Sequence, residues 1–224
     1  MKLLLIGFGR MGHLVDELAA ESGHDVVGRI TSTSRPSEWP AADVAIDFST
    51  ADAVRANIAR LAALQTNVVI GTTGWHAYEP EVRAVAGDAG LGVVASANFS
   101  IGVNLFQSVV AHAARLLAAQ PAYGAWIHEA HHAAKKDAPS GTAVLLRDAM
   151  TAAGFGRAID ISSTRAGSIP GTHTVGFDGP SDTIEITHTA RDRRGFARGA
   201  LVAAEWVHNR RGWFSMTDVL GGWG

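Results

Sequence analysis

The 224-residue sequence contains no cysteine. This absence excludes disulfide bonds, cysteine-ligated zinc and a catalytic thiol, and it agrees with a cytoplasmic location, which we expect. Long hydrophobic runs are missing as well. The apolar run Leu3–Ile6 ends at Gly7, too early for the core of a signal peptide, and no stretch approaches the roughly 20 apolar residues of a membrane span. We therefore predict a soluble protein with no membrane partner.

An excess of one charge is also missing. The chain has 19 Lys and Arg against 21 Asp and Glu, which gives a formal net charge of -2. Because the two signs are dispersed, we expect neither a nucleic-acid partner nor a polybasic surface. Hydrophobic residues make up 47% of the chain and charged residues 18%, so a large core is available and disorder is not expected.

Residues 1–97 alternate short apolar runs with alanine-rich segments. The runs predict buried strands, and the segments between them predict helices. Because strand and helix alternate and the strands are apolar throughout, we expect an α/β fold with a Rossmann-type, doubly wound parallel sheet. The expected strands cover residues 2–6, 24–30, 43–49, 67–74 and 91–97, and the expected helices cover 10–23, 50–64 and 80–90.

The pattern changes after residue 98. Helical segments now accompany strands that are separated by turns containing glycine and proline. This order predicts an α+β domain over residues 98–207, with an open mixed sheet and helices on one face. The tail, about residues 208–224, is expected to pack back on the first domain. The expected helices cover residues 102–119, 141–154 and 195–210, and the expected strands cover 122–130, 159–167, 172–179 and 182–190.

The segment GFGRMG, residues 7–12, directly follows the first expected strand and opens the first expected helix. Its spacing, G-x-G-x-x-G, places Gly7 at a tight turn, Gly9 where a pyrophosphate approaches the backbone, and Gly12 where the helix packs closely on the sheet. The N–H groups at the start of such a helix bind phosphate. We therefore predict that the first domain binds a dinucleotide.

The second expected strand leads into GRITSTSRPSE, which lacks the early acidic residue that commonly binds the ribose of NAD. The first carboxylate is Glu38, and hydroxyl groups, Arg29 and Arg35 precede it. Arginine and hydroxyl side chains bind a 2′-phosphate, which a carboxylate would repel. We hypothesise that NADPH is used at least as well as NADH. A solvated loop with no cofactor role is the alternative.

The stretch HEAHHAAKKDAPSGTA, from His128 to Ala143, allows two interpretations. Its first residues match H-E-x-x-H, a zinc-protease motif that would use His128, Glu129 and His132. That motif works only on a helix, where residues i and i+4 share one face, and the preceding AYGAWI predicts a strand. We therefore predict no metal site here.

The second interpretation uses the later residues of the same stretch. His131 and His132, followed by Lys135, form a compact group of cations and proton donors. Ser140–Thr142 then begin a helix and offer hydroxyl and N–H groups to an anion. Such a group suits a small dianionic substrate that is held by its carboxylates while His or Lys supplies a proton. An ordinary helix cap beside solvated lysines is the alternative.

The segment EAHHAAKKDAPSGTA resembles the signature of the dihydrodipicolinate reductase family, E-x-H-H-x-x-K-x-D-A-P-S-G-T. Members of this family reduce 4-hydroxy-tetrahydrodipicolinate to tetrahydrodipicolinate in bacterial lysine and diaminopimelate synthesis. The resemblance implies a Rossmann domain plus a substrate-binding domain whose open sheet forms a homotetramer. It extends over almost the whole chain, through GFGRMG, IDFS, GTTG, SANFSIGVN, RAGSIPGTHTV, IEITHTARDRRGFARGAL and SMTDVL.

The resemblance also implies roles for individual residues. His131 and Lys135 correspond to the catalytic pair of proton donors, and the sequence does not say which of them delivers the proton. The implied cofactor is NADPH or NADH, and the implied substrate is a small cyclic dicarboxylate. The implied substrate-binding residues are His132, Ser140, Gly141 and Thr142, and the implied cofactor-binding residues are Gly7, Phe8, Gly9, Arg10, Met11, Gly12, Gly71, Thr72, Thr73, Ser96, Ala97, Asn98 and Phe99.

Three features depart from the family pattern. The glycine loop is one residue shorter than the usual G-x-x-G-R-M-G, the acidic residue after the second strand is missing, and Ala166 replaces a common glycine.

Two other functions are alternatives: a related aspartate or diaminopimelate dehydrogenase, and a dinucleotide-sensing protein without catalysis. His131, Lys135 and Ser140–Thr142 argue against the sensing protein.

Overall fold

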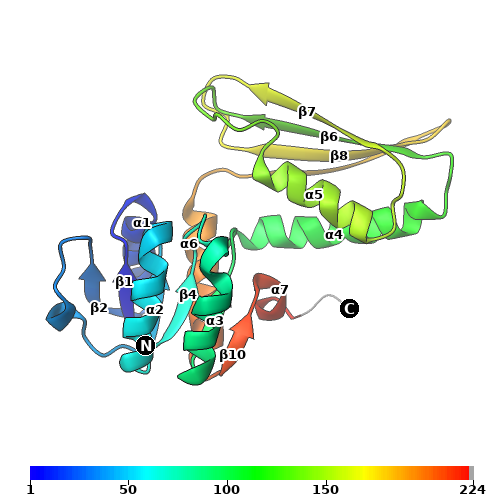
Figure 1. Ribbon diagram of the computed structural model, residues 1–224. Helices are drawn as coiled ribbons and strands as arrows, with labels where there is room; N and C mark the ends of the chain where they lie inside the picture. Colours follow the sequence, from blue (N-terminus) through cyan, green and yellow to red (C-terminus); the bar gives the residue numbers. More distant parts are fainter. Residues whose placement is uncertain (222–224) are drawn as a thin grey trace. The chain divides into compact units, whose positions relative to one another are not determined.

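The structure is a computed structural model in which residues 1–221 are described (Figure 1). The chain forms two compact units. Unit 1 comprises Met1–Ile101 and Arg193–Gly224, and unit 2 comprises Gly102–Asp192. Residues 222–224, the end of the tail that was expected to pack on the first domain, lie outside the described residues.

Unit 1 contains a parallel sheet in the order β10-β5-β4-β3-β1-β2, which confirms the predicted doubly wound fold. β2 and β3 lie on opposite sides of β1, so the direction of winding reverses there. Ligands of open parallel sheets bind outside the carboxyl ends of the strands at such a reversal. The strands are β1 (Lys2–Ile6), β2 (Asp25–Ile30), β3 (Val44–Asp47), β4 (Asn67–Ile70), β5 (Gly92–Ala95) and β10 (Gly212–Phe214).

Alternate residues of β1 face two hydrophobic cores, one on each side of the sheet. Leu3 and Leu5 join the core formed with α1 and α6, whereas Leu4 and Ile6 join the core formed with α2 and α3. Burial on both sides is the reason why these strands are apolar throughout. The helices are α1 (Arg10–Glu21), α2 (Val54–Ala63), α3 (Glu79–Asp88), α6 (Arg194–Val207) and α7 (Met216–Val219), with short 3-10 helices at Pro36–Glu38, Ala51–Ala53 and His76–Tyr78.

Helix α6 corrects the expected domain boundary. We predicted that residues 98–207 form one domain, but α6 belongs to unit 1 and places Ala197, Ala200 and Ala204 in its core. Small side chains allow this helix to pack closely, and a Cβ at Gly199 would overlap the carbonyl oxygen of Phe99. The alanine-rich face of α6 has the spacing of any buried helix, so the sequence pattern did not indicate which sheet it covers.

The described part of the tail packs on unit 1. β10 pairs in parallel with β5 and extends the sheet by one strand. Met216 of α7 is buried in the same core as α6. The ambiguous segment near the end of the chain is therefore a strand followed by a short helix.

Unit 2 contains an open mixed sheet in the order β7-β6-β8-β9, as predicted. β6 is parallel to β7 and antiparallel to β8. Helices α4 and α5 cover one face of this sheet, where Ile127, Leu146 and Phe177 are fully buried (Figure 1). The elements are α4 (Ile101–Ala118), β6 (Gly124–His131), α5 (Gly141–Ala152), β7 (Ile159–Arg165), β8 (Thr172–Asp178) and β9 (Thr183–Thr189).

Within residues 1–221, α4 is the one helix whose length and composition would allow it to cross a membrane. This is weak support for a membrane span, because core helices of water-soluble proteins meet the same criteria. α4 places Phe106, Val110 and Ala114 in the core of unit 2. The packing of these residues in the core accounts for part of the apolar composition of α4.

Candidate active site

The turn after β1 requires glycine at two positions. Gly7 has a φ of 86°, and a Cβ there would overlap the carbonyl oxygen of Phe48. A Cβ at Gly12 would overlap the carbonyl oxygen of Gly7, so the third glycine of the motif allows α1 to approach the turn. Gly9 is the N-cap of α1 and has open space around it. In the part of the chain that the structure describes, no side chain caps this helix, which leaves its first turn available to an anion.

A cavity of about 650 Å³ lies at the carboxyl ends of β1, β2 and β3. Apolar side chains line it together with the glycine turn and several hydroxyl-bearing residues, and it is of the size expected for a small-molecule site. Since the glycine turn opens into this cavity, the residues present fit the adenosine and pyrophosphate part of a dinucleotide. Among the residues that line it are Gly7, Phe8, Gly9, Thr31, Ser32, Ser34, Trp39, Ser49, Asn57 and Arg60.

The structure does not bring Arg29 and Arg35 to the wall of this cavity. Arg29 donates two hydrogen bonds to the carboxylate of Asp16, at 2.9 and 2.5 Å. Arg35 donates to Glu38, the first carboxylate after the strand.

Arg60 of α2 is the arginine that lines the cavity, with its guanidinium 5.4 Å from the ring centre of Trp39. Arg60 lies inside a helix and outside any local motif, so the sequence pattern did not indicate it.

A second cavity of unit 1, about 270 Å³, contains three of the residues assigned to the nicotinamide half of the cofactor. Thr72, Ser96 and Ala97 line it together with Trp75 and Trp213. These loops follow β4 and β5, so they lie at the same edge of the sheet as the glycine turn.

Internal contacts hold the loops of this second cavity in place. Thr72 donates to the buried carboxylate of Asp47 at 2.9 Å, and the Ser96 hydroxyl donates to the carbonyl oxygen of Asn98. Gly71 packs against the ring of Phe48, Phe99 is buried, and Thr73 is exposed.

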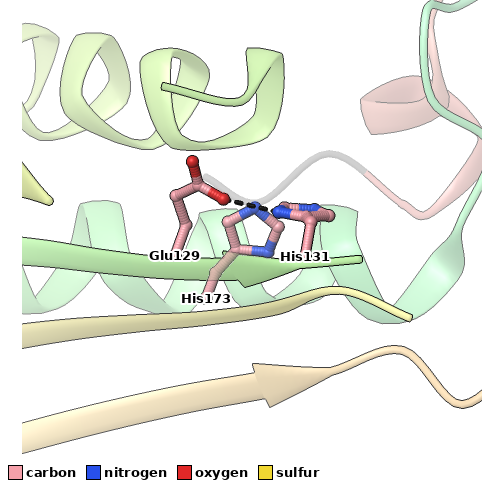
Figure 2. A group of neighbouring side chains, drawn as sticks. All are labelled: Glu129, His131 and His173. Atoms are coloured by element: carbon pink, nitrogen blue, oxygen red, sulfur yellow. Dashed lines mark hydrogen bonds and ion pairs between the residues drawn. The ribbon is translucent and has the colours of Figure 1, made fainter. Parts of the chain in front are cut away.

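In unit 2, the end of β6 separates the residues of the apparent zinc motif. Successive residues of a strand point to opposite faces, so Glu129 and His131 share one face and His128 lies on the other. His128 accordingly bonds to Ser162 of β7 at 2.9 Å, whereas Glu129 and His131 bond to each other (Figure 2). The helix that H-E-x-x-H requires is absent from these residues, and the zinc interpretation fails for that reason.

Glu129 is the centre of a buried polar cluster that the sequence analysis did not identify. Its side chain is fully buried. One carboxylate oxygen accepts hydrogen bonds from His131 Nδ1 at 2.5 Å and from Arg165 at 2.8 Å. The other accepts from Arg165 at 2.6 Å and from the Ser140 N–H at 3.2 Å. Burial alone would favour the neutral acid, but the hydrogen bonds, led by those from Arg165, lower the pKa of Glu129 to about 2.

His173 of β8 completes the cluster, with its ring 5.1 Å from that of His131 (Figure 2). Its Nε2 bonds to the hydroxyl of Ser140 at 2.9 Å, and that hydroxyl also accepts the N–H of Ala143 as the cap of α5. Burial, with the nearby charges of His131 and Lys135 adding to it, lowers the pKa of His173 to about 4. A neutral imidazole at this position therefore helps to hold the start of α5.

The loop between β6 and α5 places Lys135 beside an anion. Lys135 Nζ donates to both carboxylate oxygens of Asp137, each at 2.8 Å. Lys135 lowers the pKa of Asp137 below its ordinary value, and the backbone N–H of Gly141 acts in the same direction. The ammonium group of Lys135 thus lies beside a carboxylate shortly before the N-terminus of α5. Of the other predicted residues, His132 and Thr142 are half-buried, and Ser140 is buried with its hydroxyl engaged.

Glu129, His131 and His173 present ligand atoms within 4.8 Å of one another, close enough for a metal ion. Arg165, however, donates to both oxygens of Glu129. A guanidinium in this position supplies the positive charge that a metal would otherwise provide. The donor set therefore favours an ion pair, and we assign no metal to it.

Comparisons with known proteins place this geometry in a family. Residues 1–99 match the model of the dihydrodipicolinate reductase N-terminus, and residues 102–220 match that of its C-terminus. The 4-hydroxy-tetrahydrodipicolinate reductase of Christiangramia forsetii is 36% identical, with 98% of each chain covered. The enzyme of the same name from Methanosarcina barkeri is 44% identical over 80% of this chain and 73% of that one.

The fold agrees with these matches. A dipicolinate-bound dihydrodipicolinate reductase from Paenisporosarcina sp. TG-14 superposes with a TM-score of 0.83 at 20% identity, covering 97% of this chain and 98% of that one. Aspartate dehydrogenase from Thermotoga maritima, one of the alternatives, reaches a TM-score of 0.51 at 12% identity, covering 92% and 95% of the two chains. Because two family models together span nearly all of the sequence, this chain belongs to the dihydrodipicolinate reductase family.

Proposed function

We propose that this protein is an NAD(P)H-dependent 4-hydroxy-tetrahydrodipicolinate reductase, which forms tetrahydrodipicolinate in lysine and diaminopimelate biosynthesis. Family membership supports the reaction. The observation that carries the proposal is that Lys135 donates to both carboxylate oxygens of Asp137, shortly before the N-terminus of α5. Lys135 already holds the carboxylate of Asp137 and belongs to the same site as His131. Such a position suits a substrate with two carboxylates.

The proposed roles follow from these positions. The turn Gly7–Gly12 binds the pyrophosphate, and Gly71–Thr73 with Ser96–Phe99 contact the nicotinamide half. When bound, NAD(P)H supplies the hydride for the reduction. The substrate is bound by His132, Ser140, Gly141 and Thr142. The N-terminus of α5 holds a carboxylate of the substrate, and the buried Ser140 orients that terminus.

His131 and Lys135 supply the proton and the positive charge. Reduction of an unsaturated ring places negative charge at the far end of the conjugated system, where a cation stabilises it and a proton must be added. Protonated His131 can donate from Nε2, because its Nδ1 is held by Glu129. Lys135 carries three donor hydrogens and is held by Asp137. Each group is expected to contribute about 10²–10⁴ to the rate.

We propose that NADPH is used at least as well as NADH, with Arg60 as the phosphate-binding residue. Arg60, Thr31, Ser32 and Ser34 line the first cavity, and none of the residues that line it carries a carboxylate. A guanidinium that stacks on an aromatic ring is well placed to pair with a 2′-phosphate.

The substitution Arg60→Ala tests this assignment. It should raise KM for NADPH about tenfold or more and leave KM for NADH within about twofold, since a charge-assisted hydrogen bond contributes about 1.5–3 kcal/mol. Arg35→Ala, which removes an arginine outside the cavity, is the matched control. Equal effects of Arg60→Ala on both cofactors, or a strong preference of the wild-type enzyme for NADH, would contradict the assignment.

We also propose a cytoplasmic homotetramer. The face of the unit 2 sheet opposite α4 and α5 bears hydroxyl groups that bond across the strands, from Thr172 to Thr189 and from Thr174 to Thr187. An uncovered sheet face of this kind suits a symmetric contact between copies of the chain. Light scattering coupled to size-exclusion chromatography measures the assembly directly, and a monomer would contradict the proposal.

The reaction is tested by mixing the protein with NADPH and freshly generated 4-hydroxy-tetrahydrodipicolinate. Loss of NADPH absorbance together with formation of tetrahydrodipicolinate is the expected result. Oxidation only with the substrates of aspartate or diaminopimelate dehydrogenases would favour a dehydrogenase of that type. Binding of NADPH without turnover of any of these compounds would favour a dinucleotide-sensing protein.

A further inference from the structure

We propose that Glu129 and Arg165 form a positioning pair that holds both proton donors, His131 and Lys135, in their working geometry. This proposal rests on the proposed function, because it assigns a task to two residues that the reaction itself does not touch. Glu129 is fully buried and Arg165 is 17% exposed in its side chain. The family resemblance assigned neither residue a role, and the zinc motif that would have used Glu129 does not apply, because these residues form a strand.

The first consequence concerns the ring of His131. An ionised carboxylate can only accept hydrogen bonds, and Arg165, which cannot lose its proton, keeps Glu129 ionised. The hydrogen of the His131–Glu129 bond must therefore sit on Nδ1 of the imidazole. Nε2 is left as the position that gains and loses the proton. The pair thereby fixes both the rotation and the tautomer of His131.

The second consequence concerns the loop that carries Lys135. The Arg165 amino group that bonds to Glu129 Oε1 also donates to the backbone carbonyl of Asp137 at 2.6 Å. The side chain of Asp137 in turn accepts from Lys135. Glu129 Oε1 also accepts the N–H of Ser140, the cap of α5. One buried ion pair thus joins β6, β7, the loop and the start of α5.

Charged and titratable groups lie on each strand of the unit 2 sheet and on the loop after β6. Glu129 lies on β6, Arg165 on β7, His173 on β8 and His188 on β9, and Lys135 with Asp137 lies on the loop. Among residues 1–221, Glu129 alone is hydrogen-bonded to the ring of His131. A neutral amide in its place removes the one negative charge that directly stabilises the imidazolium form.

The substitution Glu129→Gln tests the proposal by steady-state kinetics. We expect kcat to fall about 10- to 1000-fold, KM for the substrate to change less than about threefold, and the affinity for NADPH to stay unchanged. The basic limb of the pH profile of kcat should move to lower pH, because the imidazolium form is no longer supported by a carboxylate. Glu129→Asp, which keeps the charge, should recover part of kcat and restore the position of the limb.

Glu81→Gln is the matched control. It removes a carboxylate that is also paired with an arginine, Arg55, but on the exposed surface of unit 1. This variant should match wild type in kcat and in pH profile. A Glu129→Gln enzyme with wild-type kcat and an unmoved profile would overturn the positioning role while leaving the proposed function intact. Absence of reductase activity in the wild-type enzyme would instead overturn the proposed function.

Nitrogen NMR of the wild-type enzyme, labelled in its histidines, provides a test that needs no variant. The signals of neutral His131, assigned by their loss in His131→Gln, should show Nδ1 protonated and Nε2 unprotonated. The opposite tautomer would overturn the proposal even if Glu129→Gln failed to fold.

Discussion

The two candidate sites are built from opposite materials. In unit 1, the turn Gly7–Gly12 depends on the absence of side chains at Gly7 and Gly12, and it offers backbone groups and the start of a helix. In unit 2, the cluster around Glu129 depends on polar and charged side chains from three strands and a loop that are buried together. A site made of backbone is damaged by adding an atom, and a site made of buried charges is damaged by removing one.

Removal of a proton donor from unit 2 should have the largest effect. His131→Gln or Lys135→Gln should lower kcat about 10²- to 10⁴-fold. Binding of NADPH should stay unchanged, because the cofactor loops belong to unit 1. His128→Gln is the matched control, since His128 lies on the same strand and bonds to Ser162 on the opposite face. Wild-type turnover in both His131→Gln and Lys135→Gln would show that the cluster is not the catalytic centre.

The same contrast explains what the sequence could predict. The glycine motif and the alternation of strand and helix are local patterns, and they predicted the parallel sheet and the turn after β1 correctly. Glu129, Arg165 and His173 come together only through the pairing of β6 with β7 and β8. The alternation of residues along a strand would have placed Glu129 beside His131, but no local signal connects either with Arg165.

Helix α6 and Arg60 were missed for a related reason. The position of α6 depends on which sheet its small-residue face packs against. Arg60 reaches the wall of the first cavity only because α2 packs in one core with β3 and Trp39. Conversely, Arg29 looked available in the sequence but is paired with Asp16, thirteen residues before it in the chain. Long-range packing decides which charges are left for a ligand.

Addition of a methyl group to the glycine turn should have the next largest effect. Gly7→Ala forces a side chain into a positive φ and against Phe48, so unit 1 should lose about 2–6 kcal/mol of stability. Gly9→Ala has open space around its Cβ, and stability should change by less than about 1 kcal/mol. Its methyl group nevertheless occupies the place where a pyrophosphate would approach.

Two measurements separate these two glycines. Urea unfolding should show a large loss for Gly7→Ala and almost none for Gly9→Ala, and titration with NADPH should show weakened binding for Gly9→Ala. Unchanged NADPH affinity in Gly9→Ala would mean that the turn does not hold the pyrophosphate, and the contrast between a backbone site and a side-chain site would fail.

A fall in pH should lower the free energy of unfolding of unit 2 in two steps. This is the smallest of the expected effects, and it concerns the buried side-chain cluster. His173 takes up a proton near pH 6.5 when unfolded but only near 4 when folded, so the unfolded state binds more protons between these values. The free energy of unfolding therefore falls as the pH drops through this window, by at most about 3 kcal/mol. Glu129, with a pKa lowered from 4.5 to about 2, stabilises the fold above pH 4.5, and this stability is lost as the pH falls towards 2.

His173→Gln isolates the first step, because glutamine does not titrate and can still bond to Ser140. Urea unfolding of wild type and variant between pH 7 and pH 4, followed by circular dichroism, gives the difference. The free energy of unfolding should depend less steeply on pH in the variant than in wild type. Between pH 7 and pH 4, wild type should lose up to about 3 kcal/mol more than the variant. Parallel curves would mean that His173 is not held neutral in the folded protein, and the buried cluster would then tolerate an added charge.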